Sequence, residues 1–393
     1  MISSTTRPYG LRDAPTRMAT IKGSNVSDPR VRVNEAPSIP VQPRRDRLPT
    51  ERANRCHDRA TGRTVALSAI VALSASFLAG CGSRTPKAAN SGTSNAASSL
   101  LPRPLPAGSP PNQFALHVLR GDNHATLLVA GVRINGQGPY PFLVDTGSGF
   151  SDIAPQLSRQ LHLPGASPLA GGTEGAGCGK NQPPPPPPTT PRVQISHWQL
   201  GGVQLPATVA VNSQAVDVSG SGLDGRVGSD VLSQLSPLTI GYRTGRGTLG
   251  TTNPTSPSTP PSQQVPVKVL RIQGQVLVGV PATIAGHRYA FIVDTGAGRT
   301  DVTPSTAKEL NLPVVQRGLR LAGVTCSTKT NAVALGDWHV GPVSLPNEDA
   351  VVGTVFNSGN GDQGLGGLIG GDVLSSFGTV TFDYTRQTLA LGS

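Results

Sequence analysis

The sequence predicts a mostly β protein whose main body consists of two similar lobes. Short apolar runs bounded by turn residues are numerous, whereas amphipathic helices are few. Glycine and proline account for 48 and 37 of the 393 residues, which suits many turns between strands. A ten-residue stretch occurs twice, as F-L-V-D-T-G-S-G-F-S from Phe142 to Ser151 and as F-I-V-D-T-G-A-G-R-T from Phe291 to Thr300. This repeat indicates a duplicated unit.

The net charge of +11 by itself suggests nucleic acid as a partner. Residues 1–80 carry 13 Lys and Arg and 6 Asp and Glu, a net of +7, while residues 81–393 carry 20 and 16, a net of only +4. The main body contains no cluster of Lys and Arg interleaved with aromatic residues. The sequence therefore predicts no nucleic-acid function.

Residues 1–62 are rich in Arg, Pro, Ser and Thr and show no sustained apolar period. This composition predicts a disordered N-terminal extension. A start codon assigned too early would also explain the extension, with Met18 as one alternative start.

Residues 63–81 have the pattern of a secretion signal. An apolar run from Val65 to Leu78 follows arginines and ends in Leu-Ala-Gly-Cys at Cys81. The run is short and contains serine, so it suits a signal peptide better than a membrane span. Its end resembles the bacterial lipoprotein box, which implies that Cys81 is lipidated and anchors the protein to a bacterial membrane outside the cytoplasm. An ordinary signal peptide and an uncleaved anchor remain alternatives.

A tether and two lobes follow the signal. Residues 82–112 are rich in Ser, Ala, Asn and Pro, which predicts a flexible tether that stiffens where proline accumulates. Lobe one spans residues 113–250, and lobe two spans residues 265–393. Residues 251–264 form a Thr-, Ser- and Pro-rich linker between the lobes.

The two lobes match element by element. Each begins with a strand, a turn and a second strand that ends at an aspartate, with turns at Asn135-Gly136 and Ala285-Gly286. A short helix follows each aspartate, over Ala154 to Leu163 and over Pro304 to Leu312. Equivalent residues of the two lobes are separated by similar numbers of positions. The separation is 294 − 145 = 149 for the Asp-Thr-Gly aspartates, 338 − 198 = 140 for the only two tryptophans, and 372 − 230 = 142 for the aspartates near the lobe ends. Differences of a few residues are expected for duplicated lobes whose loops have changed in length.

The aspartates at the ends of the apolar strands are candidate catalytic residues. Burying one carboxylate alone is costly. Two facing carboxylates about 3 Å apart share one proton, because like charges so close cannot both ionise. One group is then an acid and the other a base, which suits activation of a water for peptide hydrolysis. We therefore assign Asp145 and Asp294 as a dyad, although a single Asp-Thr-Gly is usually only a turn.

The two apolar-apolar-Asp-Thr-Gly-Ser/Ala stretches resemble the active-site signature of pepsin-like and retroviral-type aspartic proteases. The resemblance implies the pepsin/retropepsin fold, with two six-stranded-type β lobes and an active-site cleft between them. It also implies that Gly147 and Gly296 let the backbone approach the carboxylates and donate N–H groups. The hydroxyl groups of Thr146 and Thr295 would cross-link the two loops.

The residue three positions after each aspartate differs between the lobes. By the same resemblance, the hydroxyl group of Ser148 would donate to the outer carboxylate oxygen of Asp145, whereas Ala297 offers no such donor to Asp294. A donor stabilises the charged form. We therefore expect Asp145 to be the better anion and Asp294 to hold the shared proton.

The family's second signature consists of two hydrophobic residues and a glycine behind the catalytic loop. Lobe two fits this signature with Leu368-Ile369-Gly370. Lobe one departs from it with Arg226-Val227-Gly228, which places an arginine at a position that the family normally buries.

The candidate flaps are Gly171 to Gly179 and Leu321 to Thr328, both small and rich in Gly or Thr. Each contains one cysteine, Cys178 and Cys326, at matching repeat positions. An extracytoplasmic compartment permits disulfides, so a bond that ties the two flaps together is one possibility. Two unrelated free thiols are the alternative.

The sequence thus predicts a monomeric aspartic endopeptidase that needs no cofactor and no metal ion. Its partners would be a peptide or protein substrate and a membrane, through the lipid anchor. One alternative is a catalytically inactive peptide-binding module of the same fold. Another is a pair of retropepsin domains that act as a homodimer.

Overall fold

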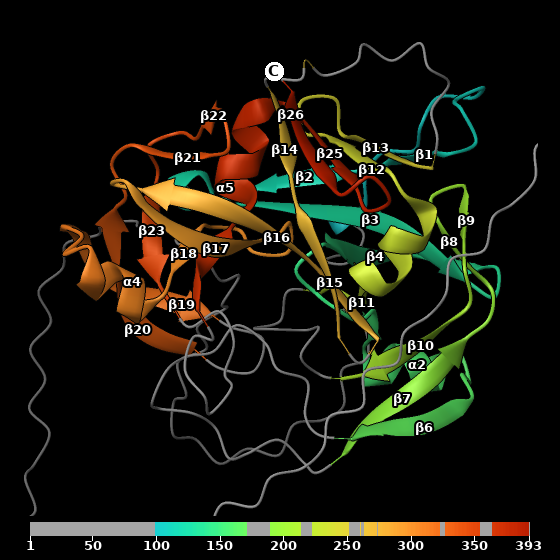
Figure 1. Cartoon of the computed structure of the whole chain (residues 1–393). Helices are drawn as coiled ribbons and strands as arrows, with labels where there is room; N and C mark the ends of the chain where they lie inside the picture. Colours follow the sequence, from blue (N-terminus) through green and yellow to red (C-terminus); the bar gives the residue numbers. More distant parts are fainter. Residues whose placement is uncertain are drawn as a thin grey trace, which may run out of the picture. The chain divides into compact units, whose positions relative to one another are not determined.

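The computed structural model describes most of the two predicted lobes (Figure 1). The chain divides into two units, Met1–Thr64 and Val65–Ser393, and all described residues belong to the second. The predictions for the N-terminal extension, the signal segment, Cys81, Cys178 and Cys326 lie outside the described residues. The described residues are 99–170, 189–213, 222–250, 260, 263–272, 274–322, 327–353 and 364–392.

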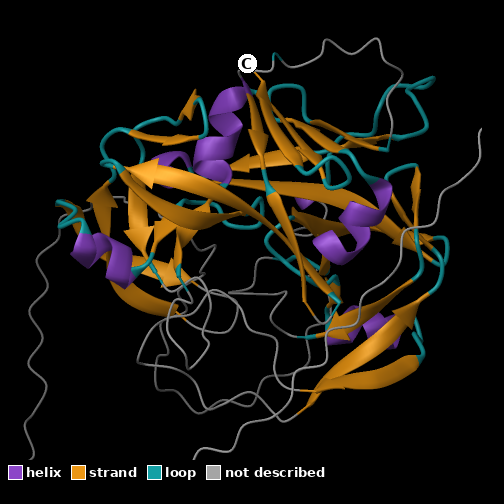
Figure 2. Ribbon diagram, viewed as in Figure 1, coloured by secondary structure: helices purple, strands orange, loops and turns teal. Residues whose placement is uncertain are grey.

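Strands dominate the described part, and the helices are short (Figure 2). The mostly β, two-lobed fold class is therefore confirmed. The helices are α2 (Pro155–Gln160), α3 (Ser229–Leu232), α4 (Pro304–Glu309) and α5 (Gly371–Leu374), with 3-10 turns η1 (Asp122–His124), η3 (Ser233–Leu235) and η5 (Ser375–Phe377).

Lobe one is built on a ten-stranded sheet in the order β6-β7-β10-β5-β11-β4-β3-β8-β9, with β2 paired to β3. It has more strands than the six expected because edge hairpins such as β8–β9 join the same sheet. Its strands are β2 (His117–Arg120), β3 (Thr126–Ile134), β4 (Gln137–Asp145), β5 (Asp152–Ile153), β6 (Gly165–Ala170), β7 (Thr189–Ile195), β8 (Trp198–Leu200), β9 (Val203–Leu205), β10 (Thr208–Asn212) and β11 (Gly225–Gly228).

Lobe two repeats this arrangement strand for strand. Its sheet has the order β19-β20-β23-β18-β24-β17-β16-β21-β22, with β15 paired to β16. The equal topology supports duplication of one unit. The strands are β15 (Lys268–Ile272), β16 (Gln275–Ile284), β17 (His287–Val293), β18 (Asp301–Val302), β19 (Val314–Ala322), β20 (Ser327–Ala334), β21 (Trp338–Val340), β22 (Val343–Ser344), β23 (Asp349–Val352) and β24 (Leu365–Ile369).

A third sheet of six strands joins the two lobes, in the order β1-β13-β12-β25-β26-β14. Three of its strands come from each lobe, and the junction is the antiparallel pairing of β12 with β25 (Figure 1). The two lobes therefore share a hydrogen-bonded base. The strands are β1 (Gln113–Ala115), β12 (Leu238–Gly241), β13 (Arg246–Leu249), β14 (Gln264–Pro266), β25 (Thr379–Asp383) and β26 (Thr388–Gly392).

The predicted turns occur where the glycines indicated them. Asn135 and Gly136 have φ of 51° and 77°, and Ala285 and Gly286 have φ of 49° and 82°. Two consecutive positive φ values are the requirement of the tight hairpin turn that matches strand twist. The equal geometry in both lobes sets the same register for the strand that leads to each aspartate.

The two predicted helices after the aspartates are present but shorter than expected. Residues His162 and Asn311 take φ of 51° and 48°, two residues beyond the ends of α2 and α4. A residue in the left-handed region terminates a helix, so neither continues to the predicted leucines at 163 and 312. At the other end of α4, the Thr303 hydroxyl accepts the N–H of Thr306 at 3.2 Å.

The two tryptophans have equivalent places in one continuous core. Trp198 and Trp338 are buried, opposite Ile134 and Ile284 in the register of their strands. Each indole N–H donates to a proline carbonyl oxygen eight residues on, at 2.7 Å for Trp198 and 2.8 Å for Trp338. A buried indole needs such an acceptor, so the matching bonds explain why tryptophan fits both sites.

The last residues of the segment expected to be a flexible tether are packed against lobe one. Leu100 is buried in an apolar cluster with Val129 and Leu143. The carbonyl oxygen of Leu100 also lies 2.9 Å from Nδ1 of His117. Ordered packing thus begins before β1.

Candidate active site

The strands of each lobe place one aspartate at the centre of its sheet. Asp145 is the last residue of β4, and Asp294 directly follows β17. These strands run parallel to β11 and β24, with Val144 opposite Val227 and Val293 opposite Ile369. The preceding apolar side chains are buried on both faces of each sheet, and this burial fixes the strand ends from which the loops start.

The two Asp-Thr-Gly loops are cross-linked through their threonines. The hydroxyl group of Thr146 accepts the N–H of Thr295 at 3.1 Å and donates to the carbonyl oxygen of Val293 at 3.0 Å. The hydroxyl group of Thr295 accepts the N–H of Thr146 at 3.1 Å and donates to the carbonyl oxygen of Val144 at 2.7 Å. The structure thus brings the two threonines together in the expected way, and the loops form one unit.

Each carboxylate is held by backbone N–H groups of its own loop. Oδ1 of Asp145 accepts the N–H groups of Gly147 at 3.0 Å and Ser148 at 2.8 Å. In lobe two, Oδ1 of Asp294 accepts the N–H groups of Gly296 at 2.7 Å and Ala297 at 3.0 Å. All the residues predicted around the dyad therefore lie at the site.

The glycines bring the carboxyl groups of the two lobes together. A β-carbon placed on Gly147 would overlap the carboxyl group of Asp294, and one on Gly296 would overlap the carboxyl group of Asp145. Each carboxyl group therefore occupies the space that a side chain at the other lobe's glycine would need. Only glycine permits this approach.

The environment of the pair favours one proton between two carboxyl groups. Burial is the largest cause that raises the pKa of Asp294 well above its ordinary value, and the neighbouring charge of Asp145 acts in the same direction. The N–H groups of Gly296 and Ala297 oppose this shift without cancelling it. Asp294 therefore holds a proton in a range where an ordinary aspartate is ionised.

The predicted role of Ser148 is wrong. Its hydroxyl group donates to the carbonyl oxygen of Phe150 at 2.7 Å, not to Asp145. A hydroxyl group has one proton to donate, and the turn after Gly147 places the Phe150 carbonyl within its reach. The difference between Ser148 and Ala297 is therefore not the source of asymmetry between the two carboxyl groups.

Sequence reasoning missed a charged group beside Asp145. Nε and Nη2 of Arg226 both donate to Oδ2 of Asp152, the former at 2.6 Å, and Nη1 of Arg226 lies 3.7 Å from Oδ2 of Asp145. Arg226 and Asp152 are direct neighbours in the pairing of β11 with β5. The sequence contains two indications of this ion pair: Arg226 interrupts the apolar signature, and Asp152 follows Asp145 by seven residues.

Lobe two has an apolar residue at the equivalent place. Leu368 lies opposite Asp301 in the pairing of β24 with β18, and packs with Leu277 and Ile292. Burial raises the pKa of Asp301 to about 8, with a further rise from the charge of Asp372 and an opposing effect of Arg299. The aspartate that meets a leucine is thus held protonated, whereas Asp152 meets a guanidinium.

Polar contacts beneath the loops fix the strands that cross behind them. The hydroxyl group of Ser151 donates to Asp230 at 2.8 Å, and that of Thr300 donates to Asp372 at 2.8 Å. These pairs occupy equivalent positions in the two lobes. They explain why an aspartate recurs after each glycine signature.

Lobe one has a further contact with the shared base. The hydroxyl group of Ser229 donates to the carbonyl oxygen of Thr146 at 3.0 Å, and its oxygen lies 3.0 Å from the hydroxyl oxygen of Tyr384. Tyr384 directly follows β25, so the active-site loop is tied to the six-stranded sheet. Lobe two has Gly371 at the matching position, where a β-carbon would overlap the Thr126 carbonyl oxygen.

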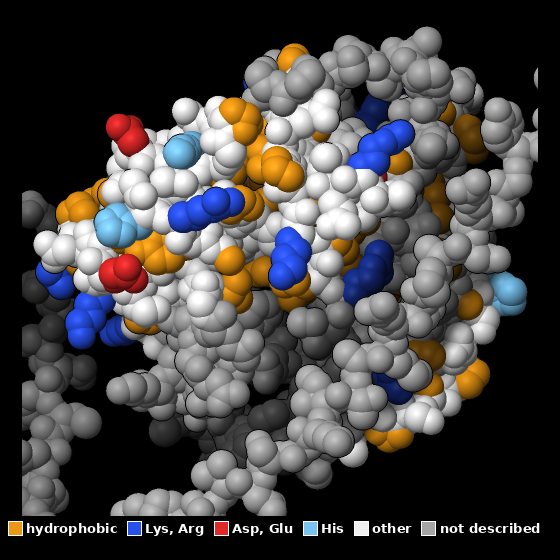
Figure 3. Space-filling model, in the orientation of Figure 1, with side chains coloured by type: hydrophobic (Ala, Val, Ile, Leu, Met, Phe, Trp, Pro, Cys, Tyr) orange, Lys and Arg blue, Asp and Glu red, His pale blue; other side chains and the backbone are white. Residues whose placement is uncertain are grey.

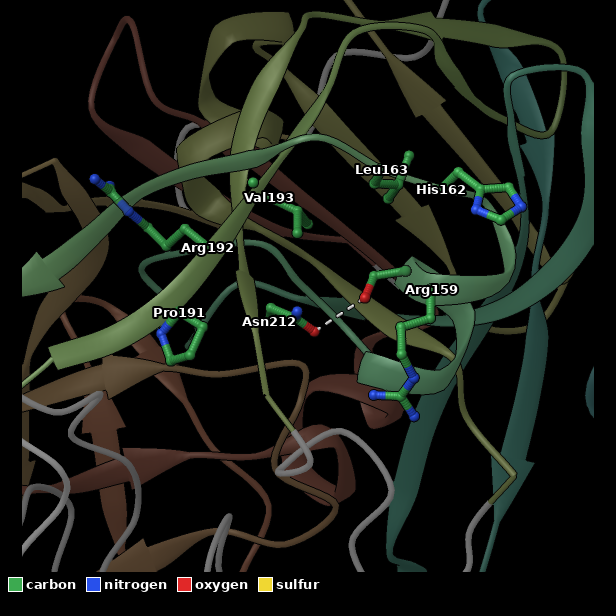
Figure 4. A pocket seen from close by; sticks show the side chains of 9 residues that line it. Arg159, His162, Leu163, Pro191, Arg192, Val193 and Asn212 are labelled. Carbon is green, nitrogen blue, oxygen red and sulfur yellow. Dashed lines mark hydrogen bonds between the residues drawn. The ribbon is translucent and has the colours of Figure 1, made fainter.

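A surface pocket of about 670 Å³ lies elsewhere in lobe one (Figure 4). Its wall includes Arg159, His162 and Arg192, and the Ser158 hydroxyl group donates to Asn212 across it at 3.2 Å. None of its lining residues belongs to an Asp-Thr-Gly loop.

On the face seen in Figure 3, Lys and Arg side chains are interspersed with polar and hydrophobic ones.

Neither a metal-holding group nor a membrane-spanning helix occurs among the described residues. They contain no group of three or more His, Cys, Asp or Glu side chains that could hold a metal ion. Nor does any helix within them have the length and apolar character needed to cross a membrane.

Comparison with known proteins agrees with the duplicated site. The family described as "Aspartyl protease" matches residues 130–231 and 280–373, one segment in each lobe. A search of curated proteins found no match.

Solved structures with some likeness include two proteins. One is an aspartic proteinase from Irpex lacteus, with 13% identity, a TM-score of 0.36, and coverage of 72% of this chain and 97% of that one. The other is conglutin gamma, a basic 7S globulin from lupine seeds, with 14% identity, a TM-score of 0.37, and coverage of 72% and 95%. The family match and the two cross-linked loops support the relationship to aspartic proteases. The chain belongs to the pepsin/retropepsin-like aspartic protease family, with one copy of the Asp-Thr-Gly loop in each of its two lobes.

Proposed function

We propose that the protein is an aspartic endopeptidase that hydrolyses peptide bonds with a water activated by Asp145 and Asp294. The observation that carries this proposal is the mutual approach of the two carboxyl groups, each against the glycine of the other lobe. Two acids so placed share a proton and supply one base and one acid at the same point.

The reaction follows from the two protonation states. The Asp145 carboxylate takes a proton from the water as the water oxygen attacks the peptide carbonyl carbon. At the same time, the protonated Asp294 donates a hydrogen bond and then its proton to the carbonyl oxygen. The resulting tetrahedral diol collapses when the C–N bond breaks. The proton on Asp145 passes to the leaving amine, and one diol hydroxyl returns its proton to Asp294, which restores the starting state.

The geometry favours this function over an inactive binding module of the same fold. A binding module would not need both aspartates, both glycines and the threonine cross-link, yet all of them are present and in contact. The cross-link also joins two loops of one chain, which supports an internal pair over two homodimeric retropepsin domains. Measuring the mass in solution would test the homodimer, since the internal pair predicts a monomer.

The function is tested by incubating the purified protein with a peptide library, with and without a statine-type inhibitor. We expect cleavage of internal peptide bonds, with loss of cleavage when the inhibitor is present. The Asp294→Asn variant serves as the matched control, because it keeps the size of the side chain and removes the acid. No cleavage by the wild-type protein across a broad pH range, or cleavage that persists in the control, would refute the proposal.

A further inference from the structure

Arg226 is a partly buried cation beside one member of the carboxyl pair. Its side chain is 17% exposed, and its Nη1 lies 3.7 Å from Oδ2 of Asp145. Burial alone would lower the pKa of Arg226, but the charges of Asp152, Asp145 and Asp294 together raise it above its ordinary value. The guanidinium therefore remains charged at every pH at which the protein is folded.

Asp152 fixes the direction in which the guanidinium points. It accepts both Nε and Nη2 of Arg226 through its Oδ2, which turns Nη1 toward Asp145. Burial raises the pKa of Asp152, and the charge and hydrogen bonds of Arg226 oppose this rise. The ion pair thus holds Arg226 in one orientation, with its free edge on the Asp-Thr-Gly loop of lobe one.

Among the described residues, Asp294 forms no ion pair with a cation. The lobe-two position equivalent to Arg226 is Leu368, whose side chain packs among apolar residues. The titratable and charged groups that bear on Asp145 are Asp294, Arg226 and Asp152, with the buried Tyr384 behind the loop. Within this set, only Arg226 supplies a positive charge, and Asp145 is the member of the pair that lies within ion-pair distance of it.

We propose that Arg226 is a positioning residue that selects Asp145 as the carboxylate of the pair and leaves the shared proton on Asp294. An adjacent cation stabilises the nearer anion more strongly, so the two possible placements of one proton differ in energy. In an exactly symmetric pair they would be equal. The assignment of base to Asp145 and acid to Asp294 rests on the proposed function, whereas the placement of the charge does not.

The test replaces Arg226 with the residue that lobe two already uses. Lobe two shows that this fold accommodates a leucine opposite a buried aspartate, so Arg226→Leu reproduces an arrangement present in the same chain. Carboxyl groups labelled with 13C would be titrated by NMR, with Asp145→Asn and Asp294→Asn to assign the signals. This readout needs no catalytic activity, so it separates failure of the inference from failure of the proposed function.

We expect the first apparent pKa of the pair to rise by about one to three units in Arg226→Leu, because an opposite charge at this range lowers an acid's pKa by that amount. In Arg226→Leu, the low-pH limb of the kcat/KM profile would move to higher pH by the same number of units. Arg226→Lys, which retains the charge, would move this limb less. If Arg226→Leu does not fold, Arg226→Gln removes the positive charge and keeps an amide donor for Asp152, so the same direction of change is expected in the titration. An unmoved first pKa in the folded variant would overturn the proposal.

Discussion

The hydroxyl group of Thr146 accepts the N–H of Thr295, and the hydroxyl group of Thr295 accepts the N–H of Thr146, both at 3.1 Å. The two residues are buried, 149 positions apart, and related by the duplication of the lobes. Each hydroxyl group also donates to a strand carbonyl of the other lobe. The two lobes therefore meet at their active-site loops through four hydrogen bonds.

Thr146→Ala should destabilise the protein by about 1–3 kcal/mol, because it leaves the buried N–H of Thr295 and the carbonyl oxygen of Val293 without partners. Thr146→Ser keeps the hydroxyl group and should lose much less. Urea unfolding of both variants measures the difference. Equal stabilities would mean that the cross-link is not what holds the loops together.

Gly147→Ala should nearly abolish turnover, since its β-carbon would overlap the carboxyl group of Asp294 and force the pair apart. Gly202→Ala is the matched control, because a β-carbon there meets nothing within 4 Å. Cleavage rates and circular dichroism of both variants would separate loss of activity from loss of folding. A Gly147→Ala enzyme with the activity of its control would contradict the close approach of the carboxyl groups.

The buried Asp301 should make the protein less stable as pH rises. Its pKa is raised from 3.8 to about 8 by burial, so between these pH values the folded state binds a proton that the unfolded state has lost. The free energy of unfolding then falls through this window, by about 1.4 kcal/mol for each unit of the pKa difference. Above pH 8 the contribution is fully lost.

Asp301→Asn should remove much of that dependence, because an amide stays neutral at every pH. The measurement is the free energy of unfolding at several pH values between 4 and 8 in the wild type and the variant. Asp372 has a pKa raised by burial to about 6, so some slope should persist at the acidic end. Identical slopes in the two proteins would show that Asp301 is ionised in the folded state.

Cys81→Ser tests the proposed lipid anchor, which rests on the Leu-Ala-Gly-Cys sequence at the end of the apolar run. We expect the variant to be released from the membrane or mislocalised, because the acyl acceptor is gone. Stable attachment needs more than one chain, so a modified wild-type protein should carry several. Membrane fractionation and intact mass report both effects. A variant that fractionates and is processed like the wild type would exclude lipidation at Cys81.

The two-lobed architecture could be predicted from the sequence because the duplication repeats local patterns that can be recognised without knowledge of tertiary contacts. The apolar run before each aspartate, the turns at Asn135-Gly136 and Ala285-Gly286, and the two tryptophans all lie where the repeat indicated. The third sheet could not be foreseen, since the pairing of β12 with β25 joins segments far apart in the chain.

The details of the site depended on contacts that spacing does not encode. Ser148 was expected to bond Asp145, yet the local turn offers the Phe150 carbonyl oxygen instead. Arg226 was visible only as a departure from an apolar signature, and its partner Asp152 lies 74 residues away. The expected asymmetry of the pair stays a prediction, and its proposed cause is now the guanidinium of Arg226 and no longer the hydroxyl group of Ser148.

The central claim is that Asp145 and Asp294 of a single chain form one catalytic pair, and the most direct measurement is the turnover of Asp145→Asn, of Asp294→Asn and of an equimolar mixture of the two. Each variant alone should lose about 100- to 10,000-fold in kcat, because each lacks one partner of the acid–base step. The mixture should be equally inactive, since both aspartates must belong to the same chain. Turnover near the wild-type rate in either single variant, or its recovery in the mixture, would contradict the claim.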